Sequence, residues 1–98
     1  MTIRQDPEDS ETQALLDFAG DLSGKTVLEI GCGDGRLTFR YAARAARVHA
    51  IDPSEKKIAK ARRKLPAALQ DRVELWATGI ENFFAPEKYD LALLSWSL

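Results

Sequence analysis

Three glycines at alternate positions constrain the fold of this chain more than any other feature: Gly31, Gly33 and Gly35. They follow the β-branched run Thr26–Ile30, which predicts a buried strand, and they precede an apolar segment of helical period. Glycine lets a backbone turn tightly and approach a ligand without steric conflict at Cβ. The N-terminus of the following helix presents N–H groups that suit an anionic ligand group. The pattern therefore indicates either a nucleotide-type binding loop or a tight turn that binds nothing.

Strand and helix patterns alternate along the rest of the chain. Further strands are predicted over residues 48–51, 73–77 and 89–95. The first helix follows the glycine loop, with its apolar face at Leu37, Phe39, Tyr41, Ala42 and Ala45. A second helix begins at Pro53 or Ser54 and ends before Pro66, residues 81–84 form a short helical turn, and an opening helix covers residues 11–19. This alternation predicts an α/β fold with a Rossmann-like parallel sheet of about four strands and flanking helices.

Length and composition predict one globular domain over residues 1–98. The chain is 45% hydrophobic and 30% charged, which is unlike a disordered segment, and no apolar run approaches the roughly 20 residues of a membrane span. Its single cysteine excludes an internal disulfide and favours a reducing compartment, so we expect a cytoplasmic protein.

Charge is distributed unevenly, although the net charge is only −1. Residues 1–21, an acidic lead-in, carry six acids against Arg4, whereas residues 35–72 carry eleven Lys and Arg against three acids. The basic helix surfaces could bind nucleic acid. A solvated face is favoured, because no aromatic residues are interleaved for base stacking.

The spacing of the glycines separates the ligand classes. A dinucleotide-binding G-x-G-x-x-G pattern would need its third glycine where Arg36 stands, and the Gly-Lys-Ser/Thr of a phosphate-binding loop is absent. The segment 28–35, Leu-Glu-Ile-Gly-Cys-Gly-Asp-Gly, resembles motif I of the class I S-adenosylmethionine-dependent methyltransferases.

The resemblance continues through three further segments. Residues 51–54, Ile-Asp-Pro-Ser, are similar to the end of the family's second strand, and this implies that Asp52 accepts from both ribose hydroxyls. Alternatively, Asp52 is only a helix-start acid. Residues 72–75 and 79–81 resemble the region around adenine, where many members carry an Asp at the place of Gly79; recognition here would rest on backbone groups and Ile80. Residues 88–95 resemble the fourth strand, whose end lies beside the transferred methyl group.

The resemblance covers residues 22–95 and implies an incomplete class I methyltransferase fold with strand order 3-2-1-4. The implied cofactor is S-adenosyl-L-methionine. Neither a catalytic base nor a metal ligand is implied, and the cofactor contacts are assigned to Glu29, Gly31, Cys32, Gly33, Gly35, Asp52, Pro53, Gly79, Ile80 and Ser95.

Four side chains have two interpretations each. Glu29 either orients the loop or reaches the cofactor's ammonium group. Cys32 is a small loop residue rather than a thiol of lowered pKa. His49 is a packed histidine rather than a general base, and Trp96 either packs on a substrate or belongs to the core.

Two functions are compatible with these features. One is a methyltransferase, or its cofactor-binding half, acting on an unidentified acceptor; the other is a non-catalytic or regulatory module that binds the cofactor and lacks an acceptor site. A nicotinamide-dependent oxidoreductase is disfavoured by Arg36. Enzymes that methylate the amino groups of nucleic-acid bases carry Asn-Pro-Pro-Tyr after the fourth strand. Its absence here argues against such an amino group as the methyl acceptor. Without a fifth strand beside it, the fourth strand is expected to present an apolar open edge and to self-associate; alternatively, residues 1–98 are part of a longer protein and the edge results from the cut.

Overall fold

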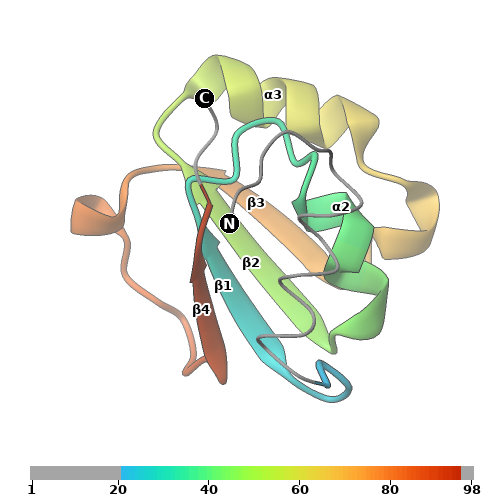
Figure 1. The fold of residues 1–98 in the computed structure, drawn as a ribbon. Coiled ribbons are helices and arrows are strands. Elements are labelled where there is room, and N and C mark those ends of the chain that lie inside the picture. The colour runs from blue at the N-terminus through green and yellow to red at the C-terminus, as the bar shows by residue number, and fades with distance from the viewer. Residues whose placement is uncertain (1–20, 96–98) are drawn as a thin grey trace, which may run out of the picture.

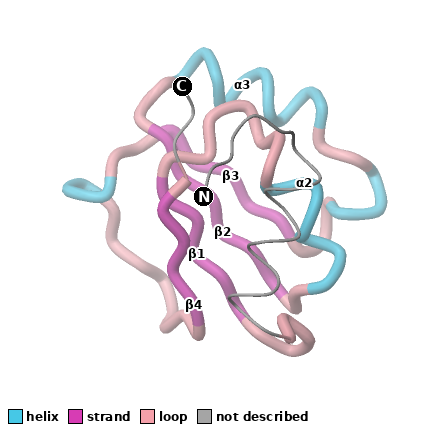
Figure 2. Tube along the Cα trace, in the orientation of Figure 1, coloured by secondary structure: helices cyan, strands magenta, loops and turns pink. Residues whose placement is uncertain are grey.

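A computed structural model describes residues 21–95, in which four strands form one parallel sheet (Figures 1 and 2). The strands lie in the order β3-β2-β1-β4, which confirms the predicted order 3-2-1-4. Their bounds are β1, Thr26–Ile30; β2, Arg47–Asp52; β3, Val73–Ala77; and β4, Leu91–Leu94. The predicted helix over 11–19 and Trp96 lie outside the described residues.

The first predicted helix is shorter in the structure. It consists of α2 (Thr38–Tyr41) followed by a 3₁₀ turn, η1 (Ala42–Arg44), after which Ala45 is extended. The residue that precedes α2 is Leu37, which offers no side-chain cap. The helix passes into this 3₁₀ turn after a single α-helical turn, and Tyr41, Ala42 and Ala45 are buried in the core as predicted.

Helix α3 (Glu55–Lys64) begins and ends where the sequence predicts. The Ser54 hydroxyl accepts from the Lys57 N–H at 3.2 Å and caps the first turn. Leu65 leaves the helical region with ψ of 118°, as expected for a residue that precedes proline. Two further 3₁₀ turns follow, η2 (Ala67–Leu69) and η3 (Ile80–Asn82).

The two faces of the sheet are covered differently. One face packs against the helices, and the fully buried residues here include Val27, Tyr41, Val48, Ala50, Ile58 and Ala61. The other face carries an aromatic cluster formed by His49, Trp76, Phe83 and Tyr89, which the β3–β4 connection completes. The sheet is thus held by helices on one side and by a loop on the other.

Strand β4 begins later than predicted, because Asp90, which was predicted to lie within it, binds Thr26 through its side chain as well as its backbone. The Asp90 carboxylate accepts from the Thr26 N–H at 2.9 Å, and the Asp90 N–H donates to the Thr26 carbonyl at 2.9 Å. Ladder pairing with β1 starts at Leu91, and Ser95 adds a last bond to the Ile30 carbonyl.

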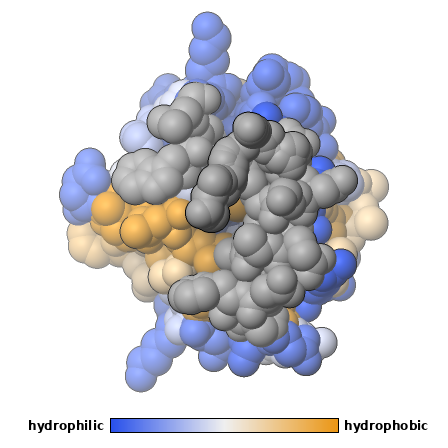
Figure 3. Space-filling model, viewed as in Figure 1, coloured by the Kyte–Doolittle hydropathy of each residue, from blue (hydrophilic) through white to orange (hydrophobic). Residues whose placement is uncertain are grey.

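Apolar surface is exposed on the β4 side of the molecule, where Figure 3 shows an orange area. The large apolar side chains that are most exposed are Phe84, at 91%, Leu94, at 67%, and Ile80, at 49%. No helix within residues 21–95 is long and apolar enough to span a membrane.

Candidate functional site

The glycine loop turns in the left-handed region. Gly31, Gly33 and Gly35 have φ of 84°, 60° and 86°, a region that side chains rarely adopt. The N–H groups of Gly31 and Cys32 both donate to the Ile51 carbonyl, at 2.8 and 3.0 Å, and Gly33 donates to the Asp52 carboxylate. These donors bind the end of β2, so the loop differs from the array of free N–H groups that its glycines suggest.

Close packing also requires two of the glycines. A Cβ on Gly31 would overlap the backbone oxygen of Ser95, which follows β4. A Cβ on Gly35 would lie 2.6 Å from the ring of Phe39 in α2. The loop therefore packs against the end of β4 only without a side chain at Gly31, whereas a side chain at Gly35 would require the Phe39 ring to move.

Asp52, the last residue of β2, is 7% exposed; one of its carboxylate oxygens binds the glycine loop and the other binds the turn that leads into α3. Its Oδ2 accepts from the Gly33 N–H and its Oδ1 from the Ser54 N–H, each at 2.9 Å. A carboxylate offers about four lone-pair sites, so about one site per oxygen is left for a ligand. The geometry suits a pair of neighbouring hydroxyl groups.

Glu29 connects three elements below the loop. Its fully buried carboxylate accepts from Thr38 at 2.6 Å and Tyr41 at 2.7 Å, both in α2, and from the Ser95 hydroxyl at 2.5 Å. Burial and the Glu29 charge raise the pKa of Tyr41 well above 10.0, so its hydroxyl remains a donor. These contacts support the interpretation that Glu29 orients the loop.

Cys32 lies 5% exposed within the loop. Burial, followed by the negative charges of Glu29 and Asp52, raises its pKa to about 12. The alternative of a thiol with lowered pKa is therefore wrong, because the loop N–H groups are outweighed by burial and by two carboxylates.

Asp34 ties the loop to helix α3. Its carboxylate lies 3.7 Å from the ammonium groups of both Lys60 and Lys64. Burial disfavours the charged form, but Lys64, the Arg36 backbone N–H and Lys60 outweigh it and hold the pKa of Asp34 below 3.8. Because the lysines are exposed, this link contributes little stability.

All the predicted cofactor residues meet at one edge of the sheet, since parallel strands end on the same side. Gly31, Gly33 and Gly35 follow β1, Pro53 follows Asp52, and Ser95 follows β4. Gly79 and Ile80 follow β3, whose last residue, Ala77, is the register partner of Asp52.

Thr38 and Tyr41 are the site residues that sequence analysis missed. They bind Glu29 from one face of α2, three residues apart. A buried acid needs donors, and this helical spacing after the loop was the available signal.

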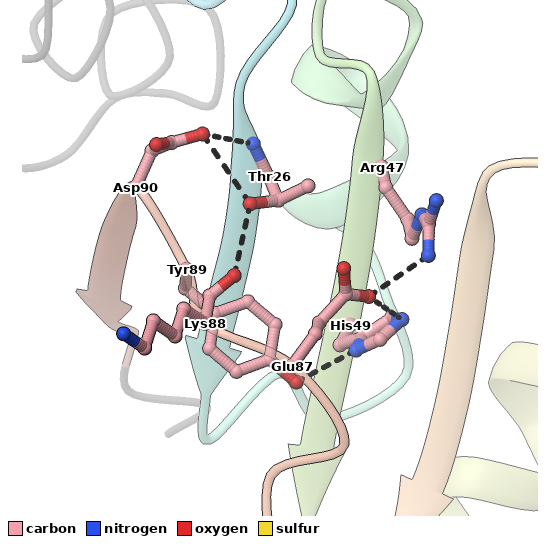
Figure 4. A network of polar contacts seen from close by, with 7 residues as sticks. All are labelled: Thr26, Arg47, His49, Glu87, Lys88, Tyr89 and Asp90. Carbon is pink, nitrogen blue, oxygen red and sulfur yellow. Dashed lines mark hydrogen bonds and ion pairs between the residues drawn. The ribbon is translucent and has the colours of Figure 1, made fainter.

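A separate polar cluster lies on the other face of the sheet (Figure 4). His49 is 3% exposed, its Nδ1 lies 2.7 Å from the Tyr89 hydroxyl, and its Nε2 lies 3.4 Å from Glu87. Arg47 binds the same Glu87 oxygen at 2.9 Å, and the Trp76 ring packs edge-on at 4.8 Å. The prediction of a packed histidine is confirmed, and the cluster fastens the β3–β4 connection to β2.

This cluster predicts a pH dependence of stability. Burial, opposed by Glu74 and Glu87, lowers the pKa of His49 below 6.5. The unfolded chain then binds the proton more readily, so the free energy of unfolding should fall as the pH drops below 6.5. Denaturant titrations on both sides of this pH should show a smaller fall for His49→Gln. An equal fall in both proteins would contradict the prediction.

Comparison with known proteins finds a match to the family model described as "Methyltransferase domain" over residues 27–98. The chain is 40% identical over 80 residues to a ubiquinone biosynthesis O-methyltransferase of Bordetella parapertussis, covering 79% of this chain and 32% of that protein. It is 37% identical over 84 residues to a probable protein arginine N-methyltransferase 6.2 of Oryza sativa subsp. indica, covering 85% of this chain and 21% of that protein.

Solved structures share this architecture. The magnesium protoporphyrin IX methyltransferase of Synechocystis PCC 6803, crystallised with bound S-adenosylhomocysteine, superposes with a TM-score of 0.71 at 29% identity. The match covers 89% of this chain and 39% of that one. The chain thus spans about a fifth to a third of the curated relatives' length.

Proposed function

The chain belongs to the class I S-adenosylmethionine-dependent methyltransferases, and on that premise we propose that it binds S-adenosylmethionine and forms the cofactor-binding half of a methyl-transferring enzyme. The observation that carries the proposal is the Asp52 carboxylate, which is buried beside the glycine loop and keeps acceptor capacity on both oxygens. The acceptor is left open, because the relatives' names include both arginine and O-methyltransferases.

The residues present fit this cofactor. A ribose offers two adjacent hydroxyl donors, which match the two acceptor sites left on Asp52. When bound, S-adenosylmethionine would supply a methyl group attached to a positively charged sulfur, and the sulfur would be the leaving group when the methyl group passes in line to an acceptor.

The protein's own part is positioning. Asp52 orients the ribose, while Gly31, Gly33 and Gly35 let the backbone approach the amino-acid end. Glu29 fixes the loop against α2 and Ser95. Cys32, Pro53, Gly79, Ile80 and Ser95 complete the proposed contacts.

Calorimetry with three ligands tests the proposal. S-adenosylmethionine and S-adenosylhomocysteine should bind, and NAD should not, because the loop lacks the third glycine of a dinucleotide site and its N–H groups already bind β2. Binding of NAD alone would contradict the proposal. Methyl transfer to a panel of acceptors, measured alongside, separates an enzyme from a non-catalytic binding module.

The loop glycine at the centre of the site predicts a specific loss of affinity. A left-handed alanine costs about 1–2 kcal/mol, so Gly33→Ala should pull the loop away from Asp52 and weaken S-adenosylhomocysteine binding about tenfold. Gly24→Ala is the matched control, because Gly24 has φ of 74° with nothing within 4 Å of its Cβ position. It should cost similar stability and leave the affinity unchanged; equal affinity losses would contradict the assignment.

Location and association are part of the same proposal. The single cysteine of the chain, Cys32, is a free thiol, which supports the proposal of a cytoplasmic protein. Within the described residues 21–95, β4 is an outer strand of the sheet with no neighbour on its far side, and this edge and the exposed side chain of Leu94 support self-association through the strand.

A further inference from the structure

Helix α3 carries most of its cations on one side. Ile58 and Ala61 are fully buried against the sheet. Five exposed basic residues lie together on the solvent side, within about a third of the helix circumference: Lys56, Lys57, Lys60, Arg63 and Lys64. Figure 3 shows strongly hydrophilic residues where Figure 1 draws α3. We call these five residues the basic face of α3.

The basic face is only partly neutralised. Within residues 21–95 its carboxylate partner is Asp34, which lies 3.7 Å from two of the lysines. The side chains of Lys56, Lys57 and Arg63 have no hydrogen bond or ion pair in the same part of the chain. Glu55, the one acid of α3, lies outside this face. Five cations against one carboxylate leave a surplus of four positive charges.

The helix dipole explains only part of this arrangement. Cations are favourable in the last turn of a helix, where Arg63 lies. Lys56 and Lys57 lie in the first turn, directly after Ser54 and Glu55, where the dipole opposes positive charge. Cations four residues apart on the same face also repel one another. A negatively charged partner on the basic face would offset both unfavourable terms.

The chain itself contains a matching negative segment. Residues 6–11, which we call the acidic segment, hold four acids and no cation: Asp6, Glu8, Asp9 and Glu11. Residues 11–19, if helical as predicted, span about 14 Å, and residues 6–10 add about 17 Å when extended. The molecule measures 32 × 29 × 29 Å, so the acidic segment is long enough to reach α3 from Asp21.

We propose that the acidic segment binds the basic face of α3 within the same chain and shields this face from other polyanions. Four negative charges then meet a surplus of four positive ones. The tether gives the segment an effective concentration on the order of 1 mM at the helix, which favours it over a free partner. Nucleic acid is the less favoured occupant, because α3 has no aromatic residue on which a base could stack.

Paramagnetic relaxation in NMR spectra tests the contact. Ser10→Cys places a nitroxide label in the acidic segment, and Cys32, which is 5% exposed, is protected from the label. At about 0.01 M salt the label should raise the relaxation rates of the α3 amides several-fold more than those of β4. At about 1 M salt charges are screened within about 3 Å, so this enhancement should be lost.

Charge reversal identifies the groups involved. Lys56→Glu, Lys57→Glu and Arg63→Glu together turn the surplus on the basic face negative and should reduce the enhancement at α3 at least about threefold. Lysine in place of all four acids of the acidic segment should then restore it in the same variant. Recovery of this kind requires that the two sets of charges meet, because a loss through altered folding would not be reversed.

A matched control reverses three cations outside the basic face. Lys25→Glu, Arg44→Glu and Lys88→Glu change the net charge of the protein by the same amount and should leave the enhancement at α3 unchanged. Equal losses in this control and in the α3 variant would overturn the proposal, since a general charge effect would explain both. An enhancement that persists in the α3 variant would also overturn it.

Two further measurements exclude other occupants. Labelled chains are mixed with unlabelled, ¹⁵N-enriched chains, and no enhancement should appear; an enhancement in the mixture would assign the contact to a second copy. Random-sequence duplex DNA should bind at least about tenfold more tightly when the four acids are replaced by their amides. The three α3 substitutions should abolish that gain. Equal DNA affinity with and without the acids would show an open basic face and overturn the proposal.

Discussion

Asp52→Ala should weaken the binding of S-adenosylhomocysteine about a hundredfold. The substitution removes two charge-assisted hydrogen bonds to the ribose, each worth about 1.5–3 kcal/mol, and each 1.4 kcal/mol corresponds to about tenfold in affinity. It also deprives the N–H groups of Gly33 and Ser54 of their acceptors, which loosens the loop. Calorimetry gives the dissociation constant directly.

Two variants define what this result would mean. Asp52→Asn keeps an acceptor oxygen but loses the charge, so its affinity should lie between those of the wild type and Asp52→Ala. Asp90→Ala also removes a carboxylate that accepts from a backbone N–H, that of Thr26, but at the opposite edge of the sheet. The affinity of Asp90→Ala should match that of the wild type. A change of less than about threefold in Asp52→Ala would exclude the proposed role of Asp52.

Glu29→Ala should lower the free energy of unfolding by about 3–5 kcal/mol. It leaves the fully buried hydroxyls of Thr38 and Tyr41 without an acceptor, at about 1–3 kcal/mol each, and it opens a cavity. It also frees the Ser95 hydroxyl. Urea denaturation followed by circular dichroism measures the loss, and Glu74→Ala, which removes an exposed acid, should stay within about 0.5 kcal/mol of the wild type.

A double-mutant cycle identifies the cause of that loss. In the wild type, Tyr41→Phe removes a satisfied hydrogen bond and should destabilise the protein by about 1 kcal/mol. In the Glu29→Ala background the same change removes an unsatisfied hydroxyl, so it should be neutral or stabilising. Equal effects in both backgrounds would show that the hydroxyl does not depend on Glu29.

The sequence alone determined the elements and the loop. The strand over 26–30 follows from its β-branched run, the strand over 73–77 from its short apolar pattern, and α3 from its cap at Ser54 and the stop before Pro66. These signals are local: each depends on residues within a few positions, so no long-range contact was needed to find them. The order of the four strands came from the family resemblance, and the structure agrees.

The tertiary structure alone decided how the site is held. Glu29 is joined to Ser95 across 66 positions of the chain, and the Gly33 N–H turns toward Asp52 instead of toward solvent. The shortening of α2 and the protonated state of Cys32 were likewise decided by the tertiary structure. Each depends on which buried groups meet once the sheet has formed, because a buried donor or charge takes the partner that packing brings to it. Local sequence patterns do not predict these contacts between residues that are distant in the chain.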